Sequence, residues 1–166
     1  RLPTEHPCPP GTYSDATDLT RVEDCLPCPE TKACGWGTGG ADNPPSDCAQ
    51  GHFCPEGTEF TTQYPCAAGT FSAATNLIAQ SGCTACPAGQ HCVGGGSTPS
   101  GLCAAGHWCS LETTHATQHP CPAGTYTAAT DSVRAEDCDP CTTGHFCEEG
   151  AAAPAPCSAG SYQDDT

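Results

Sequence analysis

Apolar residues along this chain are sparse and isolated, and no stretch repeats them with the helical period of about 3.6 residues. Gly and Pro interrupt every segment, with 19 and 17 copies among 166 residues. The pattern predicts mostly irregular structure with short β ribbons beside the recurring Gly–aromatic positions. Single helical turns are expected within residues 17–25 and 130–138, where Thr before Asp resembles a cap. The Gly-, Pro- or Ala-rich residues 35–47, 93–102 and 148–156 predict linkers.

Cysteine spacing divides the chain into tandem repeats. Three registers begin at Cys8, Cys66 and Cys121, and each continues with cysteines at successive spacings of 17, 3 and 6 residues. The first two registers add a further cysteine pair six residues apart, which the third omits. We therefore expect repeat 1 over residues 1–65, repeat 2 over 66–120, a shortened repeat 3 over 121–156, and the start of repeat 4 at 157–166.

Two motifs recur within this frame. The first, Cys-x-x-Gly-x-aromatic followed by Thr, begins at residues 8, 66, 121 and 157, so Cys157 starts a repeat. Its partner would lie 17 residues further along, past Thr166, and we expect Cys157 to be unpaired within these 166 residues. The second motif, Cys-x-x-Gly-His-aromatic-Cys, occurs at 48, 103 and 141; CPETKAC at 28 keeps its cysteines but lacks the Gly.

The composition indicates that the chain needs its cysteines in order to fold. Leu, Ile, Val, Phe and Met total 14 residues and the net charge is −15, values that alone predict disorder. Seventeen cysteines instead predict a cross-linked scaffold from an oxidising, extracellular compartment. The chain has no signal peptide, so we expect it to be an internal or mature piece of a longer precursor. Four Lys and Arg residues exclude nucleic-acid binding, and no apolar run is long enough for membrane insertion in this segment.

Cys-Pro-Ala-Gly-Thr-Tyr followed by Cys-x-x-Cys resembles the ephrin-receptor-like cysteine-rich repeat, and is similar to tumour-necrosis-factor-receptor modules and to EGF-like modules. The Cys-x-x-Gly-His-aromatic-Cys motif is similar to a motif of large extracellular proteins of protists and algae. The resemblance implies small disulfide-rich modules forming an extended rod, with contacts only between neighbours.

The resemblance also implies a disulfide pattern in which neighbouring cysteines pair. An EGF-like alternative joins the first cysteine to the third and the second to the fourth, and the sequence leaves this open. The neighbour pattern gives Cys8–Cys25, Cys28–Cys34, Cys48–Cys54, Cys66–Cys83, Cys86–Cys92, Cys103–Cys109, Cys121–Cys138 and Cys141–Cys147.

Three features have alternative chemical interpretations. The Cys-x-x-Cys pairs at 25/28, 83/86 and 138/141 have the spacing of zinc ligands, but we favour structural disulfides. The histidines His52, His107 and His145 suit metal ligands or a pH switch, and we favour packing beside disulfides. Acidic residues cluster in repeats 1 and 3 and are absent between Cys66 and Cys83, so we favour a solvated acidic face over a Ca²⁺ site.

Catalysis has no support in the sequence, which lacks the common catalytic motifs; we expect no enzyme activity, no cofactor and no metal. Asn43 and Asn76, the two asparagines, lie outside N-glycosylation sequons, whereas Ser and Thr make up 32 residues, so O-linked glycans are expected.

These observations predict a structural segment of a secreted repeat protein that forms an extracellular fibre, a flagellar-hair-like appendage or a surface coat. Its partners would be further repeats of the same polypeptide, copies of itself or other extracellular structural proteins. The alternative is the stalk or ligand-binding ectodomain of a receptor or adhesin. Trp36, in a Gly-rich stretch where repeat 1 departs from the others, is the candidate binding patch.

Overall fold

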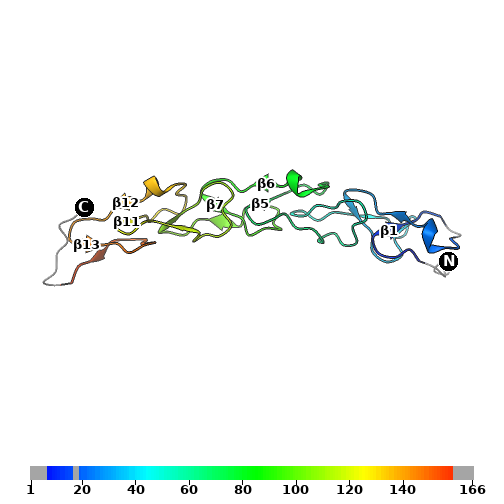
Figure 1. The fold of residues 1–166 in the computed structure, drawn as a ribbon, viewed down its shortest axis with the longest axis horizontal. Helices are drawn as coiled ribbons and strands as arrows, with labels where there is room; N and C mark the ends of the chain where they lie inside the picture. Colours follow the sequence, from blue (N-terminus) through cyan, green and yellow to red (C-terminus); the bar gives the residue numbers. More distant parts are fainter. Residues whose placement is uncertain (1–6, 17–18, 159–166) are drawn as a thin grey trace. The chain divides into compact units, whose positions relative to one another are not determined.

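A computed structural model describes residues 7–16 and 19–158. Its strands are two residues long and pair as two-stranded ribbons, as β11 and β12 do in Figure 1. The strands are β1 (Thr12–Tyr13), β2 (Leu26–Pro27), β3 (Lys32–Ala33), β4 (Ser46–Asp47), β5 (Thr70–Phe71), β6 (Thr84–Ala85), β7 (Gln90–His91), β8 (Gly101–Leu102), β9 (His107–Trp108), β10 (His119–Pro120), β11 (Thr125–Tyr126), β12 (Asp139–Pro140), β13 (His145–Phe146) and β14 (Ala155–Pro156). The ribbons are β1–β2, β3–β4, β5–β6, β7–β8, β9–β10, β11–β12 and β13–β14.

Each ribbon has the same position relative to a four-residue cysteine turn, which runs from a Cys to the residue three places later. The first strand directly follows the turn, and the second directly precedes the next turn. An isolated antiparallel bridge between His52 and Pro65 occupies this place after the turn at 48. The segment from one cysteine turn to the next is called a module below. Modules 1 to 8 are residues 8–27, 28–47, 48–65, 66–85, 86–102, 103–120, 121–140 and 141–156.

This module is a shorter unit than the repeat that the cysteine registers suggest. Modules are 16–20 residues long, and the expected repeats starting at 66 and 121 contain three and two of them. Both expected boundaries coincide with the first residue of a module. The chain divides into two compact units. The first unit comprises Arg1–Ala67, Phe71–Thr84 and Gly95–Thr98. The second unit comprises Ala68–Thr70, Ala85–Gly94 and Pro99–Thr166.

Cysteine takes the place of aliphatic residues in the interior. Among the described residues, the buried side chains are thirteen cysteines, Ala33 and six Ser or Thr residues. Thr58 and Thr113 are the largest fully buried side chains, and each hydroxyl donates to a backbone carbonyl three residues earlier. Sulfur and methyl groups therefore supply the buried apolar surface that this composition otherwise lacks.

Helical structure in the described residues consists of three 3-10 turns, η1 (Val22–Asp24), η2 (Gln80–Gly82) and η3 (Ala135–Asp137). Two of them lie where helical turns were expected, but the predicted Thr cap at 130 is wrong, since η3 begins after Arg134. The corresponding Thr17 lies outside the described residues.

The linker interpretation of residues 35–47, 93–102 and 148–156 is also wrong. These stretches end in β4, β8 and β14, respectively, and each strand pairs within its own module. Their glycines Gly37, Gly95 and Gly150 have positive φ angles of 67–77°, and each N–H donates to a carbonyl of the preceding module. Glycine is favoured here because a tight left-handed turn is formed, so the stretches belong to the folded modules.

Candidate functional site

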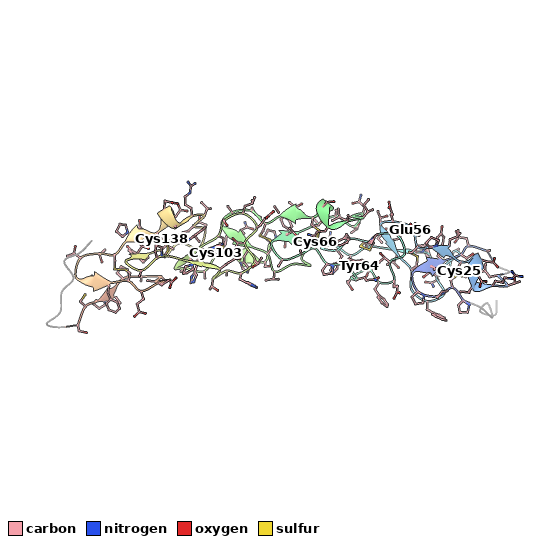
Figure 2. All side chains as sticks on the ribbon, in the orientation of Figure 1. Cys25, Glu56, Tyr64, Cys66, Cys103 and Cys138 are labelled. Atoms are coloured by element: carbon pink, nitrogen blue, oxygen red, sulfur yellow. A yellow bond between two sulfur atoms is a disulfide. The ribbon has the colours of Figure 1, made fainter. Side chains whose placement is uncertain are left out.

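Every module contains one local disulfide. The bonds have sequence separations of 17 in modules 1, 4 and 7, called long modules below, and 6 in the other five, called short modules. Cys25, Cys66, Cys103 and Cys138 mark four of them in Figure 2. The structure joins the partners that the resemblance implies: Cys8–Cys25, Cys28–Cys34, Cys48–Cys54, Cys66–Cys83, Cys86–Cys92, Cys103–Cys109, Cys121–Cys138 and Cys141–Cys147.

Successive modules are joined first by a hydrogen bond between their cysteine turns. The N–H of the cysteine that begins a module donates to the carbonyl of the last residue of the preceding turn, at 2.8–3.2 Å. The pairs are Cys28–Gly11, Cys48–Thr31, Cys66–Gly51, Cys86–Gly69, Cys103–Gly89, Cys121–Gly106, Cys141–Gly124 and Cys157–Gly144.

A second bond uses the N–H of that same last turn residue. It donates to the carbonyl six residues after the first cysteine of the next module, at 2.7–2.9 Å. The acceptor residue is a cysteine in short modules and Ser72 or Thr127 in long modules 4 and 7. The pairs are Gly11–Cys34, Thr31–Cys54, Gly51–Ser72, Gly69–Cys92, Gly89–Cys109, Gly106–Thr127 and Gly124–Cys147.

A third bond begins at the residue six places after the first cysteine. Its N–H donates to a carbonyl ten or eleven residues into the next module, at 2.8–3.2 Å. These pairs are Ser14–Thr38, Cys34–Thr58, Cys54–Leu77, Ser72–Gly96, Cys92–Thr113, Cys109–Ser132 and Thr127–Ala151. Each of the seven junctions therefore has the same three backbone bonds, and every bond joins residues of one compact unit. Backbone bonds do not depend on side chains, so modules of different sequence share one junction.

A short module adds a fourth bond to the junction with the module before it. The N–H nine residues after its first cysteine donates to the carbonyl of the preceding module's first cysteine, at 2.8–2.9 Å. The residue that donates this fourth bond has a positive φ angle in all five short modules and is glycine in four of them. The pairs are Gly37–Cys8, Gly57–Cys28, Gly95–Cys66, Glu112–Cys86 and Gly150–Cys121.

Cys157 occupies the place of a module's first cysteine. It is half-buried, has no disulfide partner among the described residues, and donates its N–H to the Gly144 carbonyl at 3.0 Å. The rest of the expected fourth repeat, residues 159–166, lies outside the described residues.

The second-motif histidines support their own turns. The imidazole Nδ1 atoms of His52, His107 and His145 lie 2.9–3.2 Å from carbonyl oxygens two residues earlier, so each Nδ1–H is a donor. Gly150 packs against the ring of His107 from two modules further along, since a Cβ on Gly150 would lie 3.5 Å from its Nε2. Each imidazole therefore hydrogen-bonds to its own cysteine turn, and packing beside disulfides stays a prediction.

Metal-ligand geometry is absent from the described part of the chain, where no group of three or more His, Cys, Asp or Glu side chains could hold a metal ion. The two cysteines of each Cys-x-x-Cys pair belong to different disulfides. Of the acidic residues, Asp137 accepts hydrogen bonds from the N–H groups of Val133 and Arg134. The Val133 bond, followed by the Arg134 bond and charge, lowers the pKa of Asp137.

Trp36 lies at the tip of a hydrogen-bonded turn in module 2 and is 66% exposed. The next residue, Gly37, donates its N–H to Cys8 at 2.8 Å and accepts a bond from the Asn43 side-chain amide at 3.0 Å. The equivalent positions of modules 5 and 8 are Gly94 and Glu149. The exposed indole is therefore specific to the first repeat and is presented on an ordered turn.

The structure has no helix, within the residues described, that is long and apolar enough to cross a membrane. No protein-family model matches the chain, and no curated protein matches it either. The chain is identified by its own structure as a series of small cysteine-rich β-ribbon modules. The module junctions were not predicted; a Cys-x-x-Gly or Cys-x-x-Thr turn every 16–20 residues was the available signal.

Proposed function

We propose that the chain is a structural segment of an extracellular tandem-repeat protein that builds a fibre, an appendage or a surface coat. The observation that carries this proposal is the recurrence of the same three backbone bonds at all seven junctions. In an array whose junctions are all alike, each added module gains stability from its neighbour. Such an array suits a structural protein that provides length or spacing. Further repeats of the same polypeptide are the first partners expected.

Surface charge and disulfides support this role. The net charge of −15 includes only four Lys and Arg residues, so neighbouring chains repel each other until specific contacts or glycans bring them together. Local disulfides stabilise each module independently of a large core, as in secreted proteins. The similarity of the motifs to ephrin-receptor-like, tumour-necrosis-factor-receptor and EGF-like modules also favours an extracellular place.

Immunoelectron microscopy of the source cells tests the proposal. Antibodies raised against the oxidised chain are applied before and after permeabilisation, with antibodies preabsorbed on the chain as the control. We expect label on fibres, appendages or the surface coat of intact cells. Label that requires permeabilisation and remains inside the cell would contradict the proposal.

The exposed Trp36 favours a second candidate, a binding segment of a receptor or adhesin. Rigid, exposed aromatic side chains are frequent anchors of protein interfaces. Trp36→Ala should then weaken binding of the chain to the surfaces of the source cells. Phe60→Ala is the matched control, because Phe60 is 60% exposed in the next module. Equal binding by both variants and the unaltered chain would contradict this candidate.

A further inference from the structure

The last residue of a cysteine turn faces a backbone carbonyl two modules further along. A Cβ built on Gly51 or Gly106 would lie 2.2 or 2.1 Å from the carbonyl oxygen of Gly95 or Gly150, respectively. The corresponding distances are 2.7 Å from Gly11 to Gly57 and 2.5 Å from Gly69 to Glu112. Atoms cannot approach this closely, so a side chain in any of these four turns would displace the backbone of the second module along.

All four of these carbonyls belong to short modules, at the left-handed residue that forms the fourth junction bond. Gly89 provides the contrast, because the second module after it is long module 7. A Cβ on Gly89 would lie 3.0 Å from the carbonyl of Asp131, which is the greatest of the five distances. The long-module loop therefore stands further back from the turn than the short-module loop.

Thr31 is the only non-glycine that ends a cysteine turn within the described residues. It adopts a φ angle of 69°, so the turn is conserved in shape even though the side chain is larger. The second module after Thr31 is long module 4, the same arrangement in which a β-carbon on Gly89 would require the facing backbone to shift by only a few tenths of an ångström. The single side chain at this position thus occurs where the facing loop leaves the most room.

We infer that the last turn residue determines which class of module can lie two places further along the array. Glycine accepts either class, whereas a residue with a β-carbon accepts only a long module. The order of long and short modules is therefore restricted by contacts between second neighbours as well as by the junction bonds. This inference concerns how the array is assembled and does not depend on the proposed function.

The third repeat shows that the array can omit a module. Repeats 1 and 2 each contain two short modules after the long one, but module 8 is followed directly by the cysteine motif that begins a repeat. Even so, Cys157 donates to Gly144 as the first cysteines of modules 2 to 8 donate to the preceding turn. Deletion of one whole module is therefore compatible with the junction, provided that the second-neighbour contacts allow it.

Two single-module deletions test the inference in the full chain. Deleting residues 48–65 places Thr31 two modules before short module 5, where its side chain would meet Gly95. Deleting residues 103–120 is the matched control, because it removes the equivalent module and leaves glycine in every affected turn. After oxidative refolding, the yield of native disulfides is measured by non-reduced peptide mapping. We expect the first deletion to lower the yield roughly tenfold or more and the control to preserve it.

Thr31→Gly combined with deletion of residues 48–65 should restore the yield to that of the control. Equal yields from the first deletion with and without Thr31→Gly would overturn the inference. Point variants of the undeleted chain give an independent comparison: Gly89→Thr should refold, whereas Gly51→Thr should lose the native disulfides of modules 3 and 5. Equal refolding of these two variants would also overturn it.

Discussion

The backbone N–H of Cys66 donates to the carbonyl of Gly51 at 2.8 Å, joining a long module to the short module before it. The same bond joins Cys28 to Gly11, where the classes are reversed. This bond is therefore independent of the disulfide loop that each module contains. The consequence is an array in which disulfides stabilise modules and backbone hydrogen bonds connect them.

Removing one disulfide should weaken its own module and the adjacent junctions. Replacing both Cys103 and Cys109 with Ser removes a loop closure over a sequence separation of 6, worth about 2.4 kcal/mol, and replacing Cys121 and Cys138 removes about 3 kcal/mol. Hydrogen exchange should accelerate at Gly89 and Cys121 for the first variant. Uniform acceleration over all eight modules would contradict local stabilisation.

The buried Thr58 side chain should stabilise module 3 beside its junction with module 2. Its hydroxyl donates to Pro55 at 2.6 Å, and its carbonyl accepts the Cys34 N–H at 2.9 Å. Thr58→Val keeps the shape but leaves the Pro55 carbonyl without this donor, so we expect a loss of about 1–2 kcal/mol. Urea unfolding measures the change, with the exposed Thr62→Val as control. A loss as large from Thr62→Val would contradict this explanation.

Glu112 should be more favourable as glycine. It has a φ angle of 64° at a position where four other short modules have glycine. Glu112→Gly removes the left-handed strain but increases the entropy of the unfolded chain, so we expect a net gain of roughly 0.5–1 kcal/mol. The reverse change in module 8, Gly150→Glu, should be destabilising. Thermal unfolding measures the stability of both variants. A change in stability of the same sign for Glu112→Gly and Gly150→Glu would contradict this account.

The η3 turn should loosen in acid. Hydrogen bonds from Val133 and Arg134 lower the pKa of Asp137 below that of an ordinary aspartate, so folding favours the ionised carboxylate. This contribution is present above the unfolded-state pKa and is lost as the pH falls through the lower folded-state pKa. As the pH falls, the rate of amide exchange at Val133, corrected for intrinsic rates, should increase in the unaltered chain. In Asp137→Asn the corrected exchange rate at Val133 should not depend on pH. An identical pH response in the variant would refute the role of Asp137.

Cysteine spacing predicted the style of fold because each local disulfide leaves a recognisable interval in the sequence. The shorter module was missed because each disulfide with a sequence separation of 17 is followed by one or two with a separation of 6, so alignment on cysteines emphasises the longer period that begins at each long module. Thr31 further concealed the turn at Cys28. Glycines such as Gly95 suggested flexible linkers, although they allow left-handed turns that bond to the preceding module. The junction bonds connect backbone atoms, so no side-chain pattern marks them apart from the Cys-x-x-Gly or Cys-x-x-Thr turn.

The most direct test of the modular array is the disulfide connectivity of the natively oxidised protein. Digestion without reduction, followed by mass spectrometry, identifies the partner of each cysteine. The bonds formed by the cysteines of the first two modules distinguish the candidate disulfide patterns. The account predicts Cys8–Cys25 and Cys28–Cys34, with every other bond up to Cys147 equally confined to one module. A first-to-third bond between Cys8 and Cys28 would contradict it, because that bond crosses a module boundary.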